Sequence, residues 1–326
     1  MEQSEPENVN ESNEQFDDHK HNAVLPKPVF IQDKKNWVRR SLISLLIYGF
    51  LFYTIFDQDI IYIAAVLVVL MIHELGHFFA MKIYHYNDVK LFVLPLLGAY
   101  VSGTKSKISQ RQMSVVILSG PIPGIIIGFC LLLSTISYPN ERLEMLGNIF
   151  FVLNLFNLLP FVPLDGGRLL ETLFVNQNHT IRTVFTIISI IMMTLLAILS
   201  QSIILLILPA FMIFDLIMKV KNQKIKEYLN HEKINYITDY SDLPDTSYWT
   251  IRDCIILSFN KRYGGVQAGE HKYNILEGSL MQHVISILEI PFIKDIKTFG
   301  KIFMVLLYIF FMVVLPLIYV LIKFLN

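Results

Sequence analysis

Charged residues are scarce in this chain. Only 17% of its 326 residues are Asp, Glu, Lys or Arg, whereas soluble proteins carry about 25%. Hydrophobic residues make up 54% of the chain, and the mean hydropathy is +0.52. The 27 basic residues balance the 27 acidic ones, so there is no net positive charge to attract a nucleic acid. The composition therefore excludes an ordinary soluble domain, argues against a nucleic-acid partner and indicates a membrane protein.

Cysteine is nearly absent as well. The chain has two cysteines, Cys130 and Cys254, which lie far apart in sequence and in different surroundings. This spacing predicts neither a disulfide nor a metal cluster built on cysteine. We expect both side chains to be buried or inert thiols.

Long apolar runs, by contrast, are frequent, and each can be compared with the ~20 residues that a membrane-spanning helix needs. The runs are 41–56, 60–84, 114–134, 146–164, 181–200, 203–218 and 302–324. They predict an all-α polytopic membrane protein with about six to seven transmembrane helices. The predicted domains are a disordered polar tail (1–36), a transmembrane core (37–220), a cytoplasmic segment of unknown role (221–300) and a C-terminal transmembrane helix (301–326).

Lysine and arginine in the short loops predict the orientation of the chain, because such residues gather on the cytoplasmic side. They precede the first apolar run, occupy the loop after the second run and follow the sixth run, but they are absent from the loop at 57–59. We therefore expect an integral, multi-pass membrane protein with a cytoplasmic N-terminus. Residues 73–77 fall in the cytoplasmic half of the bilayer.

Two segments do not fit the pattern of spanning helices. Residues 88–112 mix β-branched residues with Pro and Gly, which predicts a re-entrant or interfacial segment resembling a β-hairpin. Residues 219–300 are more polar, and apolar residues alternate in "WTIRDCIILSF" (249–259). That alternation indicates some β-strand in the cytoplasmic segment.

The second apolar run contains three polar side chains, in "MIHELGHFFA" (71–80). A charged side chain at membrane depth costs about 2.5–3.5 kcal/mol, so such residues usually serve a function. His73 and His77 stand four residues apart, which places both imidazoles on one face of a helix. This spacing matches two ligands of a tetrahedral zinc ion. Glu74 lies beside the ligand row, where its carboxylate can accept a proton from water.

Two histidines leave a zinc site incomplete, so we expect a third ligand at a similar depth. Asp165 is the candidate, because the apolar run at 146–164 ends on the same side of the membrane as residues 73–77. Prolines and glycines around it break the helix and permit a tight turn.

Other roles for these carboxylates remain open. Asp165 could instead cap the following helix with Arg168 as its salt partner. Asp215 and Glu171 are weaker candidates for the third ligand, and Asp215 stands alone near the end of a span.

"HELGH" in an early span and "NLLPFVPLDGGR" in a later one together resemble the site-2 protease family of intramembrane zinc metallopeptidases. The resemblance covers roughly residues 60–220. It implies that His73, His77 and Asp165 bind one Zn²⁺ per chain and that Glu74 is the catalytic base. It also implies a metalloendopeptidase that cleaves a transmembrane protein substrate within the lipid bilayer.

The resemblance extends to three further residues. Asn157 matches the asparagine of the family's N-x-x-P-x-x-x-x-D-G pattern, which implies a contact with the substrate carbonyl or oxyanion; a purely structural amide is the alternative. "LLGAYV" (96–101) resembles the family's glycine-rich membrane loop, which implies substrate contacts at Gly98 and Tyr100. Ala99 stands where a second glycine is common, and "SGPIPG" (119–124) lacks the asparagine expected a few residues later.

The resemblance predicts regulated intramembrane proteolysis, in which segment 88–101 pairs with a locally unwound substrate. One alternative is a prenyl-protein-type membrane zincin, whose third ligand is a glutamate. Another is a zinc transporter or a catalytically inactive membrane scaffold. The intact Glu74 argues for an active enzyme, because a transport site does not need a general base at this position.

Overall fold

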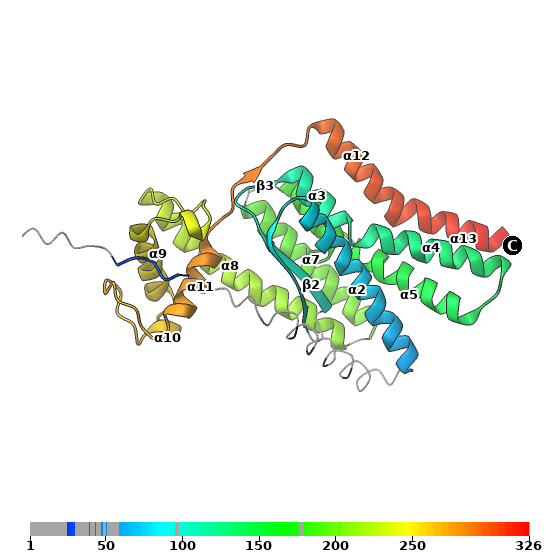
Figure 1. Ribbon diagram of the computed structural model, residues 1–326, viewed down its shortest axis with the longest axis horizontal. Coiled ribbons are helices and arrows are strands. Elements are labelled where there is room, and N and C mark those ends of the chain that lie inside the picture. Colours follow the sequence, from blue (N-terminus) through cyan, green and yellow to red (C-terminus); the bar gives the residue numbers. More distant parts are fainter. Residues whose placement is uncertain are drawn as a thin grey trace, which may run out of the picture.

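The computed structural model describes residues 25–29, the single positions 39, 43, 47 and 50, and the ranges 59–94, 98–175, 179–201 and 203–325. The predicted first span at 41–56 falls almost wholly outside the described residues, as does most of the predicted tail at 1–36. Within the described ranges the chain is mostly helical (Figure 1).

Helices, most of them long, form the larger part of the molecule. They are α2 (Ile60–Ile83), α3 (Gln110–Leu118), α4 (Pro121–Ser137), α5 (Glu141–Asn157), the short α6 (Asp165–Leu170), α7 (His179–Leu199), α8 (Ile207–His231), α12 (Thr298–Ile309) and α13 (Leu315–Leu325). Side-chain caps mark two of the starts. The Asp59 carboxylate accepts from the N–H of Ile61, and the Asn140 side chain accepts from two N–H groups at the start of α5.

Four helical stretches of the described chain are long and apolar enough to cross a membrane. They are Ile60–Ile83, Gln110–Ser137, His179–Leu199 and Thr298–Leu325. Each contains or overlaps a predicted span, so the predicted class, an all-α polytopic membrane fold, is confirmed. The run at 146–164 contributes to the 17-residue α5, and the run at 203–218 to a 3₁₀ turn and the first half of α8.

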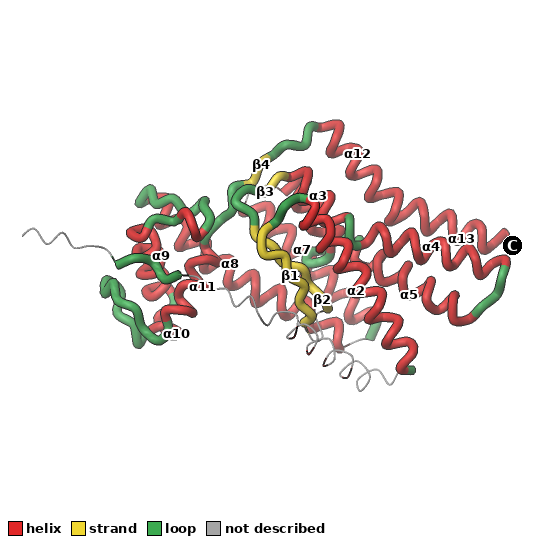
Figure 2. The backbone as a smooth tube through the Cα atoms, viewed as in Figure 1, coloured by secondary structure: helices red, strands yellow, loops and turns green. Residues whose placement is uncertain are grey.

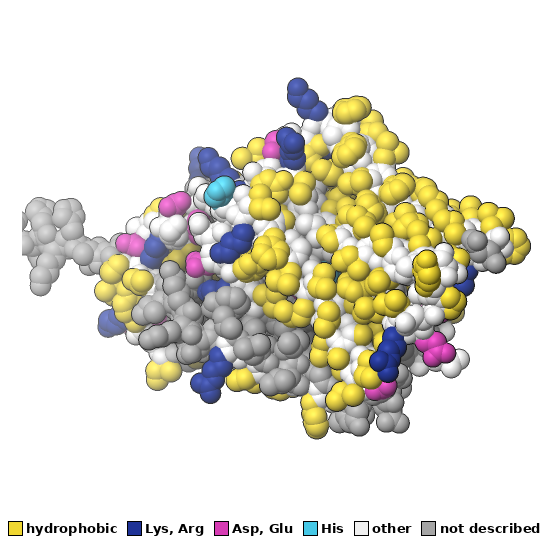
Figure 3. Space-filling view, turned by 45° about the vertical axis from the view of Figure 1, so that its right-hand side comes forward, with side chains coloured by type: hydrophobic (Ala, Val, Ile, Leu, Met, Phe, Trp, Pro, Cys, Tyr) yellow, Lys and Arg dark blue, Asp and Glu magenta, His cyan; other side chains and the backbone are white. Residues whose placement is uncertain are grey.

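Apolar side chains cover the outside of these helices, as the space-filling view shows (Figure 3). On α7, α12 and α13 many Ile, Leu and Phe side chains point outward, for example Ile188 and Leu317. Exposed apolar surface of this extent marks a membrane-facing or partner-facing surface. On helices of membrane-spanning length it is the surface expected to face lipid.

The segment predicted to resemble a β-hairpin is a two-stranded antiparallel sheet, with β1 (Asn87–Leu94) paired to β2 (Gly98–Thr104). The register places Val93 opposite Ala99 and Phe92 opposite Tyr100. The hairpin lies along α2 (Figure 2). Its buried side chains Val89, Leu91 and Val101, with Tyr86 just before β1, pack against Met71, Leu75, Phe78 and Met81 of that helix.

A separate helical unit follows the membrane core; we define it as residues 225–287. It contains the end of α8, a 3₁₀ turn at Tyr240–Asp242, α9 (Asp245–Ser258), α10 (Asn260–Tyr263) and α11 (Glu277–Ile287), around a hydrophobic core of its own. The unit lies at the left of Figure 1, joined to the core by α8.

The strand expected within residues 249–259 is wrong, because most of this stretch belongs to α9. The buried residues of α9 are Tyr248, Trp249, Ile251, Arg252, Ile255 and Ile256, which recur at the three- and four-residue spacing of one helix face. The alternation seen in the sequence was produced by β-branched residues on that face, which favour strands only weakly.

The chain returns from the helical unit to the core through a short parallel pairing of β3 (Ile108–Ser109) with β4 (Phe292–Ile293). Asp295 fixes this return at the start of α3. One carboxylate oxygen accepts from the Ser109 hydroxyl at 2.5 Å, and the other accepts from the N–H of Arg111 at 3.0 Å. Within the described residues, α8 and this pairing both attach the helical unit to the core.

Candidate metal centre

The two histidines of α2 and Asp165 at the start of α6 meet inside the core. The Nε2 atoms of His73 and His77 are 3.2 Å apart. They lie 3.1 Å and 3.3 Å, respectively, from Oδ2 of Asp165. All three side chains are buried. Residues nearly ninety positions apart in sequence therefore direct three ligand atoms at one point.

Hydrogen bonds define which nitrogen of each histidine faces that point. Nδ1 of His77 lies 2.8 Å from the carbonyl oxygen of Val116, which can only accept, so Nδ1 carries the proton. Nδ1 of His73 lies 2.8 Å from Oδ1 of Asn154. The Asn154 amide is oriented by its own Nδ2, which donates to the Phe150 carbonyl at 2.7 Å. Both Nε2 atoms therefore direct a lone pair toward Asp165.

Three electron-pair donors in van der Waals contact repel one another unless a cation lies between them. Oδ2 of Asp165 is also buried without a hydrogen-bond donor. Two imidazoles and a carboxylate are the ligands that zinc prefers. Bonds of about 2.0–2.1 Å in tetrahedral geometry separate ligand atoms by about 3.3–3.4 Å. The three observed separations, 3.1, 3.2 and 3.3 Å, are close to that value, so the residues fit a zinc ion.

Glu74 is the remaining polar side chain at the centre. It follows His73 on α2 and is 8% exposed. Among the described residues no hydrogen bond or ion pair holds its carboxylate. A carboxylate beside a metal centre that is not itself a ligand and has no other partner is free to accept a proton.

Glycines allow α4 to approach the centre closely. A Cβ atom at Gly120 would lie 2.3 Å from Nε2 of His77, and one at Gly124 would lie 2.2 Å from Nδ2 of Asn154. Neither space can hold a larger side chain without displacing His77 or Asn154. The glycines of the "SGPIPG" segment therefore contribute to the site because they have no side chain.

The chain between α5 and α6 aims Asp165, and its backbone is stabilised by two other helices. The helix break leaves the Leu158 carbonyl and the Val162 N–H outside regular helical bonding. The Tyr308 hydroxyl of α12 donates to the Leu158 carbonyl at 2.8 Å. The Ser189 hydroxyl of α7 accepts from the Val162 N–H at 3.2 Å. Such pairing is required wherever irregular backbone lies at membrane depth.

The other candidate ligands lie in different contacts. Asp215 forms an exposed ion pair with Lys219 at 2.7 Å, one helical turn along α8. Glu171 pairs with Arg182 at 2.6 Å. Of the carboxylates considered from the sequence as third ligand, Asp165 alone joins the described group of the two histidines.

The predicted substrate-contact residues lie in two places. Asn157 ends α5, and its Nδ2 donates to the Leu153 carbonyl at 3.3 Å. Gly98 and Tyr100 belong to β2. Their contacts with a substrate stay predictions.

Asn154 is a further candidate site residue that the sequence patterns did not single out. It lies one helical turn before Asn157 and is fully buried, with its amide bound to His73. Its signal was present as the first residue of "NLFNLLPFVPLDGG". The family pattern matches the second asparagine, Asn157, instead.

Comparison with known proteins supports the family resemblance. The sequence profile of Peptidase family M50 matches residues 61–141, a range that contains His73, Glu74 and His77 but not Asp165. The resemblance to the site-2 protease family is confirmed by this match and by the curated relatives. This resemblance, together with the four described helices that are long and apolar enough to cross a membrane, identifies an integral membrane protein.

Two curated relatives are similar over part of their length. A zinc metalloprotease of Methanocaldococcus jannaschii is 28% identical over 159 residues, which is 45% of each chain. Stage IV sporulation protein FB of Bacillus subtilis is 32% identical over 113 residues, 34% of this chain and 39% of that protein. The chain thus spans less than half the length of these relatives. A solved structure, the site-2 protease from Methanocaldococcus jannaschii, aligns with a TM-score of 0.42 and 24% identity, covering 54% of this chain and 86% of that one.

Proposed function

We propose that this chain, a relative of Peptidase family M50, is an intramembrane zinc metalloprotease that hydrolyses peptide bonds of membrane-spanning proteins. The observation that carries the proposal is the convergence of two imidazole lone pairs and one carboxylate beside a second carboxylate that has no partner among the described residues. The first three groups would hold one zinc ion, and the fourth is Glu74.

The residues divide the chemistry between them. When bound, zinc would act as a Lewis acid that polarises the scissile carbonyl and lowers the pKa of water to about 7. Glu74 accepts a proton from the attacking water at a carboxylate oxygen and delivers it to the departing amide nitrogen. Asn154 and the Val116 carbonyl hold the two imidazoles with their Nε2 atoms toward the metal. We further assign Asn157 to the substrate carbonyl or oxyanion.

Burial suits this chemistry. His73, Asp165 and Glu74 are each less than a tenth exposed, so bulk water is excluded from the site and electrostatic interactions there are strong. The basic loops favour an active site in the cytoplasmic half of the bilayer and a cytoplasmic N-terminus. Labelling of the lysines in 219–300 by a membrane-impermeant amine reagent in intact cells would contradict this orientation.

Purified protein in proteoliposomes tests the proposed function against transport. We expect zinc-dependent cleavage of a membrane-spanning peptide and no zinc flux through the same vesicles, because the site places a proton acceptor beside its ligands. A zinc chelator should stop cleavage, and zinc added back after the chelator is removed should restore it. Zinc flux without cleavage would favour the transporter; neither flux nor cleavage would favour the inactive scaffold.

The hairpin β1–β2 provides a place for an unwound substrate. A helical substrate hides its carbonyl groups until it unwinds, and an extended segment can then pair with a strand edge. Within the described residues β2 pairs with β1 and with no other strand. We propose that the substrate adds to this sheet, near Gly98 and Tyr100.

Proline substitutions should separate this role from metal binding. The N–H groups of successive strand residues point to opposite edges, so Ala99→Pro and Tyr100→Pro remove one donor at each edge in turn. Loss of one backbone hydrogen bond, about 1 kcal/mol, corresponds to a roughly fivefold slower cleavage. One of the two variants loses the N–H at the edge of β2 that faces away from β1. For that variant we expect retained zinc, slower cleavage of a helical substrate and less effect on a short extended peptide. Ala99→Ser is the matched control, and equal loss on both substrates would assign the hairpin to the fold.

A further inference from the structure

The N-terminal segment Leu25–Val29, "LPKPV", lies across the helical unit although more than two hundred residues separate them in sequence. Aromatic side chains of the unit donate to the backbone of the segment. The bonds run from Trp249 Nε1 to the Leu25 carbonyl at 2.6 Å, from the Tyr240 hydroxyl to the Pro28 carbonyl at 2.7 Å, and from the Tyr273 hydroxyl to the Pro26 carbonyl. Side-chain donors aimed at the carbonyls of Leu25, Pro26 and Pro28 form a site for an extended peptide.

Lys27 is recognised most completely. Its ammonium donates to the carbonyls of Tyr240, Ser241 and Leu243 at 2.6, 2.9 and 2.5 Å. An ammonium has three donors, and each finds an acceptor here. The Lys27 N–H also donates to Oδ1 of Asp245 at 2.9 Å. The planar fork of an arginine would not fit this arrangement of carbonyls.

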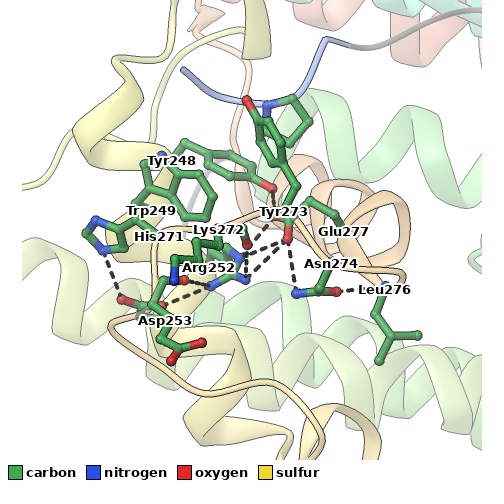
Figure 4. Close-up of polar contacts among 12 residues, drawn as sticks. Tyr248, Trp249, Arg252, Asp253, His271, Lys272, Tyr273, Asn274, Leu276 and Glu277 are labelled. Carbon is green, nitrogen blue, oxygen red and sulfur yellow. Dashed lines mark hydrogen bonds and ion pairs between the residues drawn. The ribbon is translucent and has the colours of Figure 1, made fainter. Parts of the chain in front are cut away.

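The aromatic groove is built from within the helical unit rather than by the segment. Arg252 is completely buried and pairs with Glu277, its Nε lying 3.0 Å from Oε1 (Figure 4). Its NH1 and NH2 groups donate to the carbonyls of Glu270 and Lys272, which fixes the loop that carries Tyr273. The Trp249 ring stacks on Tyr273 at 6.0 Å.

The sequence of the segment suits recognition in an extended form. Pro26 and Pro28 restrict the backbone toward the polyproline conformation, which lowers the entropy lost on binding. Aromatic grooves are a recurrent means of binding such segments. The backbone carbonyls of Pro26 and Pro28 accept from the Tyr273 and Tyr240 hydroxyls, respectively.

We propose that the helical unit is a peptide-recognition module for an extended leucine–proline–lysine–proline segment, and that residues 25–29 occupy it as an intramolecular ligand. A partner protein that presents such a segment binds only when the chain's own segment has left. This proposal does not depend on proteolysis.

A labelled peptide of residues 22–32 tests the proposal on the full-length protein in detergent. In the Lys27→Glu chain the three carbonyls face a carboxylate, so the chain's own segment should leave and the peptide should bind. In the wild-type chain the tethered segment competes at about millimolar effective concentration, so a peptide of micromolar affinity should bind about 10³-fold more weakly. A peptide carrying Lys27→Arg should bind neither protein well.

Two more variants keep the test decisive. A chain with Pro26→Ala and Pro28→Ala retains the ammonium but loses the preset backbone, and it should also bind the added peptide. Adding Tyr273→Phe to the Lys27→Glu chain removes one donor from a half-exposed side chain and should weaken binding several-fold. The proposal is overturned if wild-type and Lys27→Glu chains bind the peptide equally. It is also overturned if neither opened chain binds it while circular dichroism matches the wild type.

Discussion

Glu74→Gln should reduce peptide-bond cleavage by about 10²–10⁴-fold, the contribution typical of a general base. The glutamine amide has nearly the same shape but cannot accept the proton of the attacking water. Zinc content should stay at one per chain, because Glu74 is not among the three converging ligands. Cleavage of a membrane-spanning peptide in proteoliposomes and elemental analysis of the same preparation measure the two effects.

Glu171→Gln is a matched control for this substitution. Glu171 lies six residues after Asp165 but pairs with Arg182 rather than with the metal centre. The control should cleave at close to the wild-type rate. Near wild-type cleavage by Glu74→Gln would remove Glu74 as the base.

Asp165→Ala should lose most of the bound zinc, because a site with three protein ligands is left with two. His73→Ala should have the same effect. Asn154→Ala keeps all three ligands but frees the His73 ring, so zinc affinity should fall by about 10–100-fold, the usual cost of losing a group that orients a ligand. Zinc titration by competition with a chromogenic chelator measures the whole series.

Two controls accompany the metal series. Asp215→Ala removes an exposed carboxylate that pairs with Lys219, and Asn157→Ala removes an amide bound to its own helix. Both should bind zinc like the wild type. Stoichiometric zinc in Asp165→Ala would exclude Asp165 as a ligand, and a larger loss in Asn157→Ala than in Asn154→Ala would reverse their assigned roles.

The convergence of His73, His77 and Asp165 could be predicted from sequence because these residues obey local rules. The four-residue spacing of His73 and His77 fixes their common helix face, and the proline-rich break before Asp165 identifies a turn that points inward. Asn154 could not be assigned in this way. Which of two asparagines on α5 faces His73 depends on the rotation of α5 against α2, which arises from packing between helices.

The membrane helices were predictable from hydropathy, but the helical unit was not. In α9, β-branched residues such as Ile251 and Ile255 lie on a buried helix face, so tertiary packing overrides their weak preference for strands. The groove for residues 25–29 depends on contacts across more than two hundred residues. No local sequence pattern predicts such contacts.

During translation, the loop between α5 and α6 that leads to Asp165 is made long before the residues that stabilise its backbone. The Leu158 carbonyl is bonded by Tyr308, and the Val162 N–H by Ser189, both of which are translated later. An unpaired backbone group in hydrocarbon costs several kcal/mol, so a nascent chain that ends before α12 cannot hold this loop as the finished protein does. The candidate metal centre is therefore completed late in translation, after α12 has been made and has inserted beside α5.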